Sequence, residues 1–558
     1  MIKYNPVSIK SILLTLSLFI AFNSCTDGWE EMNKPNFQPV EGEENNPGGT
    51  DDPDEPVTIV GDPGDYIYEF TYNGVIDNHQ RTTNLYHDLY AHYFANNKFE
   101  ASNHYLYRDD WMKNRWEQFY TKRFQEFKNI IKICKQDKDV HFRNAYHIAW
   151  INYYFLVSLM TDTYGPIPCT SVIENMEYEI ANDVIVEDPD IYYDTQEEIY
   201  DRLFTRLAVH QDSLLTGGEE TYEYGERENI YGGDALKWKR FANSLRLRLA
   251  VRIANIDPIR AKVEAEDAIA AGVMTSNDDT YAVHYNWPNG HENDYALVGF
   301  LWGDVVMSKD LEVMYKTQSD RLDPRCPVCW YRNLSPHSDI LQFREAPFGD
   351  YVGNDNGAEN VQHGDDKYSY LKSRMGERNN DAWFDYNRPF ECLNYAEVCF
   401  LLAEANLRNW TGASNGVENY YKEGIRASMD YYNIERLEAE RYIAGISNNP
   451  FMGGDREAIL EQIINQKWLA NFPNGSEGWA DFRRTDYPAL SQIISNRSND
   501  VEQGKFIKRI NYPVSEHDLN SDNVYYPYAN DSKGQKLWWD VMDTHNGPYS
   551  RNTPNNFR

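Results

Sequence analysis

The sequence predicts a mostly α protein built from helix pairs of the tetratricopeptide type, with a long loop-rich insertion. Apolar residues recur at steps of three and four over much of the chain, as on one face of a helix. Short breaks rich in Gly, Ser and Asn separate neighbouring apolar stripes, as between two antiparallel helices. The stretch from about 275 to 389 has little sustained helical period and is rich in Asn, Asp, Gly, Pro and aromatic residues. A loop-rich insertion of this length is usually functional or disordered, and its aromatic residues argue against disorder.

The N-terminal residues 1–24 predict a secretory signal peptide. Lys3 and Lys10 precede an apolar run, Ile12–Phe22, which is shorter than the roughly 20 residues of a membrane-spanning helix. Phe22-Asn23-Ser24-Cys25 resembles a bacterial lipoprotein processing site, which would make Cys25 the acylated first residue of the mature protein. The alternative is a plain signal peptide with a chance cysteine.

Residues 25–65 predict a flexible acidic tether, and residues 66–558 a single folded domain. From Asn36 to Asp65 the chain is rich in Pro, Gly, Asn and acidic residues, too polar to bury a core. Over the whole chain 87 acidic residues outnumber 54 basic ones, giving a formal net charge of −33. Because such a charge repels phosphate backbones, the composition argues against nucleic-acid binding.

Periodic segments along the folded part predict its helices in order. Thr195 begins one of them, with Glu198 three residues later, which predicts a capping box. In another, Arg246, Arg248 and Arg252 are distributed around the helix. The predicted helices are Trp111–Lys135, Phe142–Asp162, Asp194–Leu215, Lys237–Asn255, Pro258–Ala271, Asp304–Tyr315, a pair within Cys392–Tyr432 broken at Trp410–Gly416, and Glu457–Phe472.

No catalytic constellation or cofactor motif is present in the sequence. It lacks HExxH, GxSxG, a Walker loop and a dinucleotide fingerprint, so we expect no enzyme and no cofactor. Cys326 and Cys329 have metal-knuckle spacing but no second pair, so we expect a local disulfide or two packed thiols and no metal site. Cys392 and Cys399 lie about 10.5 Å apart along a helix, too far for a disulfide, and predict core residues.

Several blocks resemble the SusD/RagB family, in its SusD-like branch of nutrient-binding outer-membrane lipoproteins. The resemblance rests on NYAEVCFLLAEANLRNW followed by YYKEGIRASMDYY, and on TDTYGPIP, YDTQEEIYDRL, KWKRFANSLRLRLA and RINYPVSE in the expected order. It therefore covers nearly the whole chain. It implies a tetratricopeptide-like scaffold with long irregular segments on one side, glycan binding, and a partnership with a SusC-like TonB-dependent transporter at the cell surface.

The 42 tyrosines and 14 tryptophans suggest where a ligand binds. In the family, aromatic rings stack on sugar faces while polar side chains bind hydroxyl groups; the competing explanation is packing between helices. We favour packing inside the periodic helices and binding in the loops. The predicted ligand-binding residues are Trp287, Tyr295, Trp302, Trp330, Tyr331, Trp383, Tyr105, Tyr107, Asn289 and Arg332.

The predicted function is therefore a cell-surface lipoprotein that captures a nutrient, an oligosaccharide in the first instance, and delivers it to the transporter. One alternative is a peptide ligand in the same transport role. A second is a surface-anchored helical-repeat adaptor that binds another protein, and a third is a secreted glycosidase, disfavoured by the lack of a motif.

Overall fold

A computed structural model describes most of the chain after residue 60. The described residues are 61–96, 100–137, 141–187, 189–218, 220–285, 293–334, 337–338, 342–343, 348–358, 366–372, 387–446, 454–521, 531–542 and 554–557. They belong to one compact unit, Ile59–Arg558. The predicted signal peptide, Cys25 and most of the tether lie outside the described residues.

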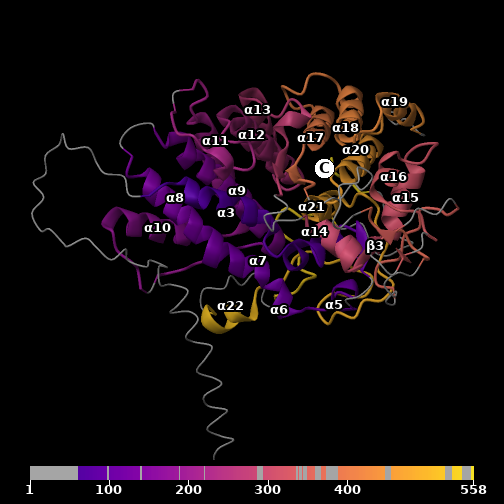
Figure 1. The fold of residues 1–558 in the computed structure, drawn as a ribbon, viewed down its shortest axis with the longest axis horizontal. Coiled ribbons are helices and arrows are strands. Elements are labelled where there is room, and N and C mark those ends of the chain that lie inside the picture. Colours follow the sequence, from indigo (N-terminus) through magenta and orange to yellow (C-terminus); the bar gives the residue numbers. More distant parts are fainter. Residues whose placement is uncertain are drawn as a thin grey trace, which may run out of the picture. The chain divides into compact units, whose positions relative to one another are not determined.

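Helices that follow one another in the chain pack side by side and form the scaffold (Figure 1). In the first group α3 packs on α8, α8 on α9, α9 on α11, α11 on α12, and α12 on α13. In the second group α17 packs on both α18 and α20, and α17 also packs on α12, which joins the two groups. Their bounds are α3 Gly64–Ile76, α8 Phe124–Cys134, α9 Arg143–Tyr164, α11 Gln196–Asp212, α12 Ala235–Arg252, α13 Pro258–Ala271, α17 Tyr395–Leu407, α18 Val417–Tyr431 and α20 Arg456–Ala470.

This arrangement confirms the mostly α prediction and most of the predicted helices. The capping box at the start of α11 is present, with Thr195 accepting from the Glu198 N–H and Glu198 bonding back to Thr195. The segment predicted as one helix, Trp111–Lys135, is broken instead: α6 (Asp109–Met112), α7 (Asn114–Glu117) and a π-helical turn, η2 (Gln118–Arg123), precede α8. The segment predicted as a helix from Asp304 begins as a strand, β3 (Val305–Met307), and Ser308 then caps α15 (Lys309–Thr317).

The remaining elements are short, and several gather on the side away from α8 and α10 (Figure 1). Three antiparallel two-stranded sheets pair β1 with β3, β2 with β6 and β4 with β5. These elements are η1 Gln80–Asn84, α4 His87–Tyr90, β1 Phe94–Asn96, α5 Glu100–Asn103, α10 Thr170–Asn182, η3 Gly225–Arg227, η4 Asn277–Asp279, β2 Tyr281–Val283, α14 Asp294–Ala296, η5 Leu297–Leu301, α16 Arg325–Cys329, β4 His337–Ser338, β5 Gln342–Phe343, β6 Phe390–Leu393, α19 Arg436–Ala444, α21 Gly475–Thr485 and α22 Val514–Leu519.

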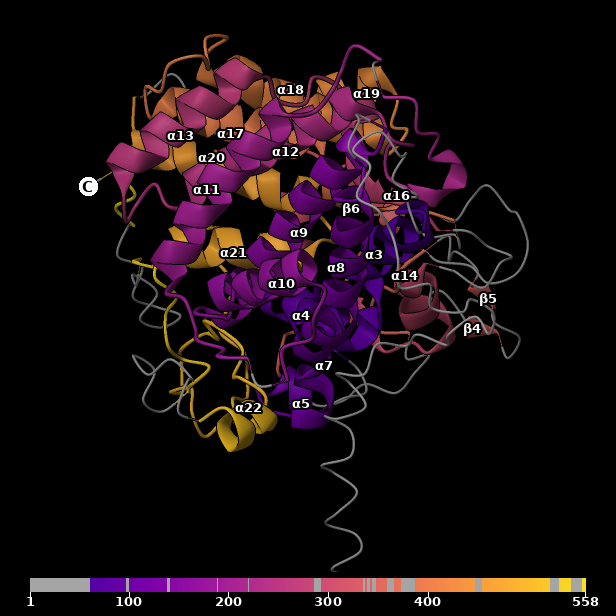
Figure 2. The same cartoon turned by 90° about the vertical axis from the view of Figure 1, so that its left-hand side faces the viewer.

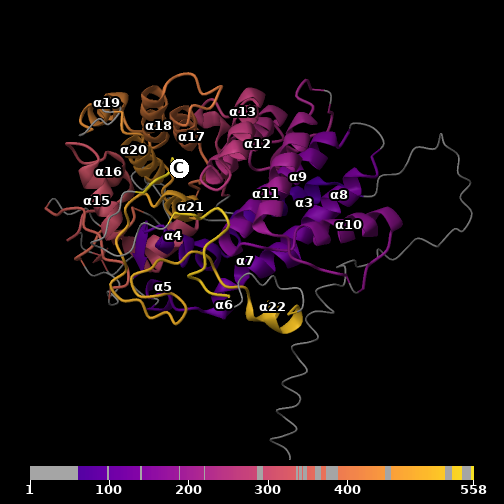
Figure 3. The ribbon, with the colours of Figure 1, turned by 180° about the vertical axis from the view of Figure 1, so that it is seen from behind.

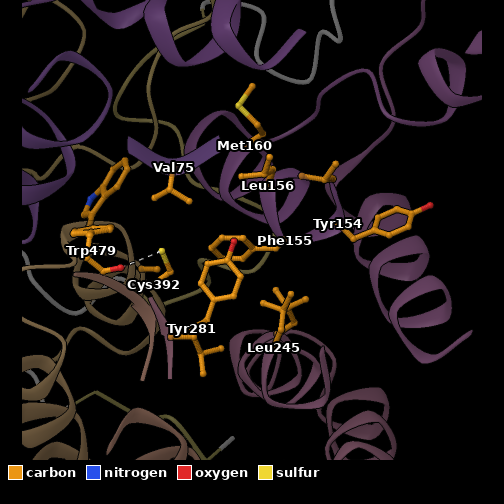
Figure 4. Close-up of a cluster of buried hydrophobic side chains, with 14 of the residues drawn as sticks. Val75, Tyr154, Phe155, Leu156, Met160, Leu245, Tyr281, Cys392 and Trp479 are labelled. Carbon is orange, nitrogen blue, oxygen red and sulfur yellow. Dashed lines mark hydrogen bonds between the residues drawn. The ribbon is translucent and has the colours of Figure 1, made fainter. Parts of the chain in front are cut away.

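The hydrophobic core lies where α3, α9, α12 and α21 meet β2 and β6 (Figure 4). At its centre the Tyr281 ring stacks on Phe241, with ring centroids 4.3 Å apart, and contacts Phe155 at 5.1 Å. The Tyr281 hydroxyl donates to Asn152 Oδ1 at 2.7 Å, so this buried polar group is satisfied. Viewed from the side, α11, α12, α13, α17 and α20 form a layer above this core (Figure 2).

A buried network of ion pairs crosses the junction between the two helix groups. Arg248 of α12 binds Glu397 of α17 at 2.7 Å. Lys467 of α20 lies 2.6 Å from both Glu477 and Asp481 of α21. All five side chains are at most 6% exposed. Burial alone would raise the pKa of Glu477, but the charges of Arg252, Lys467 and Arg248 hold that pKa well below its usual value.

Candidate functional site

The described residues line two small pockets in the helical scaffold. One is lined by residues that include Arg115, Gln118 and Arg123, and another by residues that include Asp162, Arg252 and Glu477. Each has a volume of about 20 Å³, which is room for about one water molecule. Among the described residues there is also no group of three or more His, Cys, Asp or Glu side chains that could hold a metal ion.

In the described part of the loop-rich region, three segments are joined to one another and to β3 by main-chain hydrogen bonds. We call these three segments the loop scaffold. It consists of residues 329–334, 348–354 and 366–372. The Met307 N–H donates to the Ser369 carbonyl at 3.0 Å, and the Ser369 N–H donates to the Val352 carbonyl at 2.8 Å. The Tyr331 N–H donates to the Tyr370 carbonyl at 2.9 Å. Because its main chain is tied to β3, this region is built more like a small sheet than like a free loop.

The loop scaffold presents aromatic, aliphatic and basic side chains at its surface. Phe348 is 83% exposed and Leu334 is 50% exposed. Tyr331, Arg332 and Lys372 are half-buried. We call these residues the platform: Tyr331, Arg332, Leu334, Phe348 and Lys372.

Main-chain hydrogen bonds hold the platform in place. The Asn333 N–H donates to the Asp350 carbonyl at 2.8 Å, and the Asp350 N–H donates back to Asn333 Oδ1 at 2.8 Å. This pairing sets Phe348 beside residues 332–334, where a Cβ on Gly349 would stand 3.4 Å from Arg332 Cβ. Leu334 has a positive φ of 60°, a strained conformation for a branched side chain, and its N–H is tied to the Asp366 carbonyl.

The two basic side chains of the platform each lie over an aromatic ring. The Lys372 Nζ atom lies 5.5 Å from the centroid of the Tyr331 ring. The Arg332 guanidinium lies 5.8 Å from the centroid of the Tyr351 ring. Both distances are within the roughly 6 Å reach of a cation–π contact. Burial opposes ionisation of the nearby Asp350, but its hydrogen bond from Lys316 outweighs this and lowers its pKa, so this carboxylate stays charged and paired.

Of the residues predicted from the sequence to bind ligand, Tyr331 and Arg332 lie in the platform. Trp302, which is 36% exposed, follows η5 and precedes Gly303 and β3. Tyr107 is half-buried elsewhere, and its hydroxyl donates to Asp109 at 2.7 Å. Trp287, Asn289 and Trp383 lie outside the described residues.

Three further predicted residues are buried and have to be corrected to core residues in this conformation. Trp330 is 0% exposed, and its ring packs with the rings of Phe94 and Phe472, at centroid distances of 5.8 and 5.7 Å. Tyr295 is 0% exposed, and its hydroxyl lies 2.8 Å from Asp88 Oδ2. Tyr105 is 3% exposed. The physical reason is clearest at Trp330, whose extended backbone turns its side chain to the opposite side from that of Tyr331.

The sequence prediction missed Phe348, Leu334 and Lys372. A signal for Phe348 exists in the sequence, since a large aromatic residue between Pro347 and Gly349 is typical of a turn that displays its side chain. Leu334 and Lys372 carry no comparable signal. Their place depends on pairing with residues 366 and 329, far away in the chain.

The cysteines of the described region are buried and reduced. Cys326 and Cys329 on α16 are free thiols, so the structure has the packed-thiol form of the two forms expected from their spacing. Burial raises the pKa of both thiols above the usual value. Cys392 and Cys399 are 3% and 1% exposed, which confirms the prediction that both are core residues.

Asp88, which accepts a hydrogen bond from the Tyr295 hydroxyl, should make the stability of the protein depend on pH. Burial raises its pKa from 3.8 to about 7, although hydrogen bonds from Tyr295, Asn84 and the Gly475 N–H partly oppose the rise. Between about pH 4 and pH 7 the native state therefore binds more protons than the unfolded state, so this group's contribution to stability falls as pH rises. We expect the free energy of unfolding of the wild type, minus that of Asp88→Asn, to fall by about 3 kcal/mol from pH 4.5 to pH 8 in urea titrations. A difference that is the same at both pH values would contradict this.

Comparisons with known proteins agree with the fold. A family profile described as "Starch-binding associating with outer membrane" matches residues 57–513. A chitin-binding SusD homolog from Flavobacterium johnsoniae is 27% identical, with a TM-score of 0.70, and the match covers 86% of this chain and 98% of that one. No curated protein sequence matches the chain.

Two further solved structures show the same fold. A SusD homolog from Parabacteroides distasonis is 23% identical with a TM-score of 0.72, and one from Bacteroides ovatus is 25% identical with a TM-score of 0.66. Each match covers 86% of this chain and 98% of the other. Within the described residues, none of the helices is long and apolar enough to cross a membrane.

Proposed function

The chain belongs to the SusD-like family, and from this premise we propose that it is a cell-surface lipoprotein that binds an oligosaccharide on the platform and delivers it to a SusC-like TonB-dependent transporter. It binds its ligand without cleaving it. In this proposal Cys25 carries the lipid anchor, and the tether runs from residue 25 to about residue 60, since Asp62 pairs with Arg227 and α3 begins at Gly64. Residues 1–24 are the signal peptide.

The observation that carries this proposal is the display of Phe348 and Tyr331 on a hydrogen-bonded scaffold. A flat ring offers a large contact area to the C–H face of a sugar and loses little conformational freedom on binding. The scaffold holds both residues in place before the ligand arrives, which lowers the entropic cost of binding. In this proposal Arg332 and Lys372 donate hydrogen bonds to sugar hydroxyl groups.

Two kinds of glycan are the first candidates for the ligand. The family description names starch, an α-linked glucan, whereas the similar Flavobacterium johnsoniae protein binds chitin, a β-linked polymer of N-acetylglucosamine. A peptide ligand remains the alternative within the same transport role. We favour a sugar because Phe348 is 83% exposed, so its ring can contact the C–H face of a sugar.

Calorimetric titration tests this proposal. Purified protein lacking residues 1–25 is titrated with malto-oligosaccharides, with chito-oligosaccharides and with a tryptic peptide digest, and each mixture is then analysed for new products. We expect saturable binding to one of the two glycan series, no binding to the digest, and unchanged ligand after overnight incubation. Cleavage of the bound glycan, or binding to peptides alone, would overturn the proposal.

A further inference from the structure

A short segment near the last residue of the sequence, Pro554–Phe557, lies in a pocket between helix ends of the scaffold. We call this segment the tail. The pocket is formed by Asn255 after α12, Arg408 after α17, Arg456 and Glu457 in the first turn of α20, and Thr485 at the end of α21. In Figure 3 the chain end marked C lies beside α17, α20 and α21.

Asn556 at the centre of the tail is 2% exposed, and both its main chain and its side chain are bound. Its N–H donates to Glu457 Oε2 at 3.0 Å, and its Nδ2 donates to Glu457 Oε1 at 2.6 Å. The same Nδ2 also donates to the Thr485 carbonyl at 3.2 Å. Oδ1 accepts from Asn255 Nδ2 at 2.8 Å. The Asn556 carbonyl accepts from Arg408 Nη1 at 3.1 Å.

These contacts select the side-chain amide of asparagine. Glu457 accepts two hydrogen bonds and therefore needs donors, and the carboxylate of an aspartate in place of Asn556 would supply none. Such a carboxylate would also face the Glu457 charge directly, which is unfavourable. An alanine would keep the main-chain hydrogen bond to Glu457 Oε2, but Glu457 Oε1 and the Thr485 carbonyl at the end of α21 would lose the amide donor.

Phe557 supplies the second recognition element. Two guanidinium groups lie close to its ring: the Arg408 Cζ atom is 5.0 Å and the Arg456 Cζ atom 4.1 Å from the ring centroid. It also packs against the hydrophobic cluster of α17, α18 and α20. Both arginines are held independently of the tail, because Arg408 binds Glu404 at 2.9 Å and Arg456 donates to the Leu407 carbonyl at 3.0 Å.

We propose that this pocket is a peptide-recognition site for an Asn-Phe sequence, occupied in this chain by its own tail. Glu457, Asn255 and Thr485 bind the asparagine amide, and the two arginines contact the phenylalanine ring. Since its parts belong to helix ends of both scaffold groups, the bound tail ties α12, α17, α20 and α21 together. The pocket is separate from the platform, and the proposal does not depend on the identity of the glycan.

A trans-binding experiment tests this site. A variant that lacks residues 554–558 is mixed with a fluorescein-labelled peptide of residues 552–558, and with a matched peptide that carries the Asn556→Asp substitution. We expect a lower Tm for the variant than for the full chain, saturable anisotropy with the Asn peptide, a recovery of Tm on its addition, and at least tenfold weaker binding of the Asp peptide. Equal binding of the two peptides, or none with an unchanged Tm, would overturn the proposal.

A full-length substitution covers the case in which the shortened chain does not fold. Carboxypeptidase should remove the tail residues from Asn556→Asp at least tenfold faster than from the wild type, because only the wild-type tail is held in the pocket. Equal rates of removal would overturn the proposal. Glycan affinity should be the same in both proteins, which keeps this outcome distinct from a failure of the platform.

Discussion

We expect the double variant Tyr331→Ala, Phe348→Ala to bind oligosaccharide at least 100-fold more weakly than the wild type and to keep its Tm within a few degrees. Removing an aromatic anchor from the centre of a binding surface typically costs about 2 kcal/mol or more, and each 1.4 kcal/mol is a tenfold change in Kd. Stability should change little, because Phe348 is 83% exposed and Tyr331 is half-buried at the edge of a small cluster. Calorimetry with the glycan that binds the wild type gives the affinity, and thermal unfolding gives the Tm.

Tyr178→Ala is the matched control for this experiment. Tyr178 is an aromatic residue on α10 that is 58% exposed and lies outside the loop scaffold. We expect its removal to leave the glycan affinity unchanged. An equal loss of affinity in the control, or wild-type affinity in the double variant, would show that the platform is not the glycan-binding surface.

Breaking the buried ion-pair network has the largest expected effect on stability. Glu477→Gln removes the carboxylate shared by Arg252 and Lys467, and all three side chains are at most 6% exposed. Because buried cations would lose their counter-charge, we expect the free energy of unfolding to fall by about 3–5 kcal/mol in urea titrations.

An exposed ion pair provides the control for the network. Lys422 and Glu418 lie 2.6 Å apart on α18, with side chains 36% and 42% exposed. Water screens this pair, so Glu418→Gln should cost less than about 1 kcal/mol. Similar losses from Glu477→Gln and Glu418→Gln would show that burial does not strengthen the network, contrary to our interpretation.

The fold could be predicted from sequence wherever the information is local. The helix Pro258–Ala271 was predicted with the bounds that α13 has, because Pro at its start and Gly272 after its end are local signals. The break in Trp111–Lys135 was not predictable, since the apolar period continues through α6, α7 and η2. The burial of Arg248 and Arg252 could not be predicted from the sequence either, because their partners Glu397 and Glu477 lie far away in the chain.

The candidate site could be predicted only as a region. Aromatic composition pointed to the loops, and Tyr331 and Arg332 lie in the platform. The same composition could not separate Trp330 from Tyr331, because which of two neighbouring residues faces the core depends on the pairing of residue 330 with Leu371. The tail pocket gave no signal in the sequence, since its residues come from four separate helix ends.

Hydrogen–deuterium exchange with and without bound glycan tests whether the platform is the glycan-binding surface. If the ligand binds on the platform, exchange should slow in residues 329–334, 348–354 and 366–372, and stay unchanged in α10 and in the tail. Slower exchange elsewhere at saturating glycan, with no change in these three segments, would show that the glycan binds away from the platform.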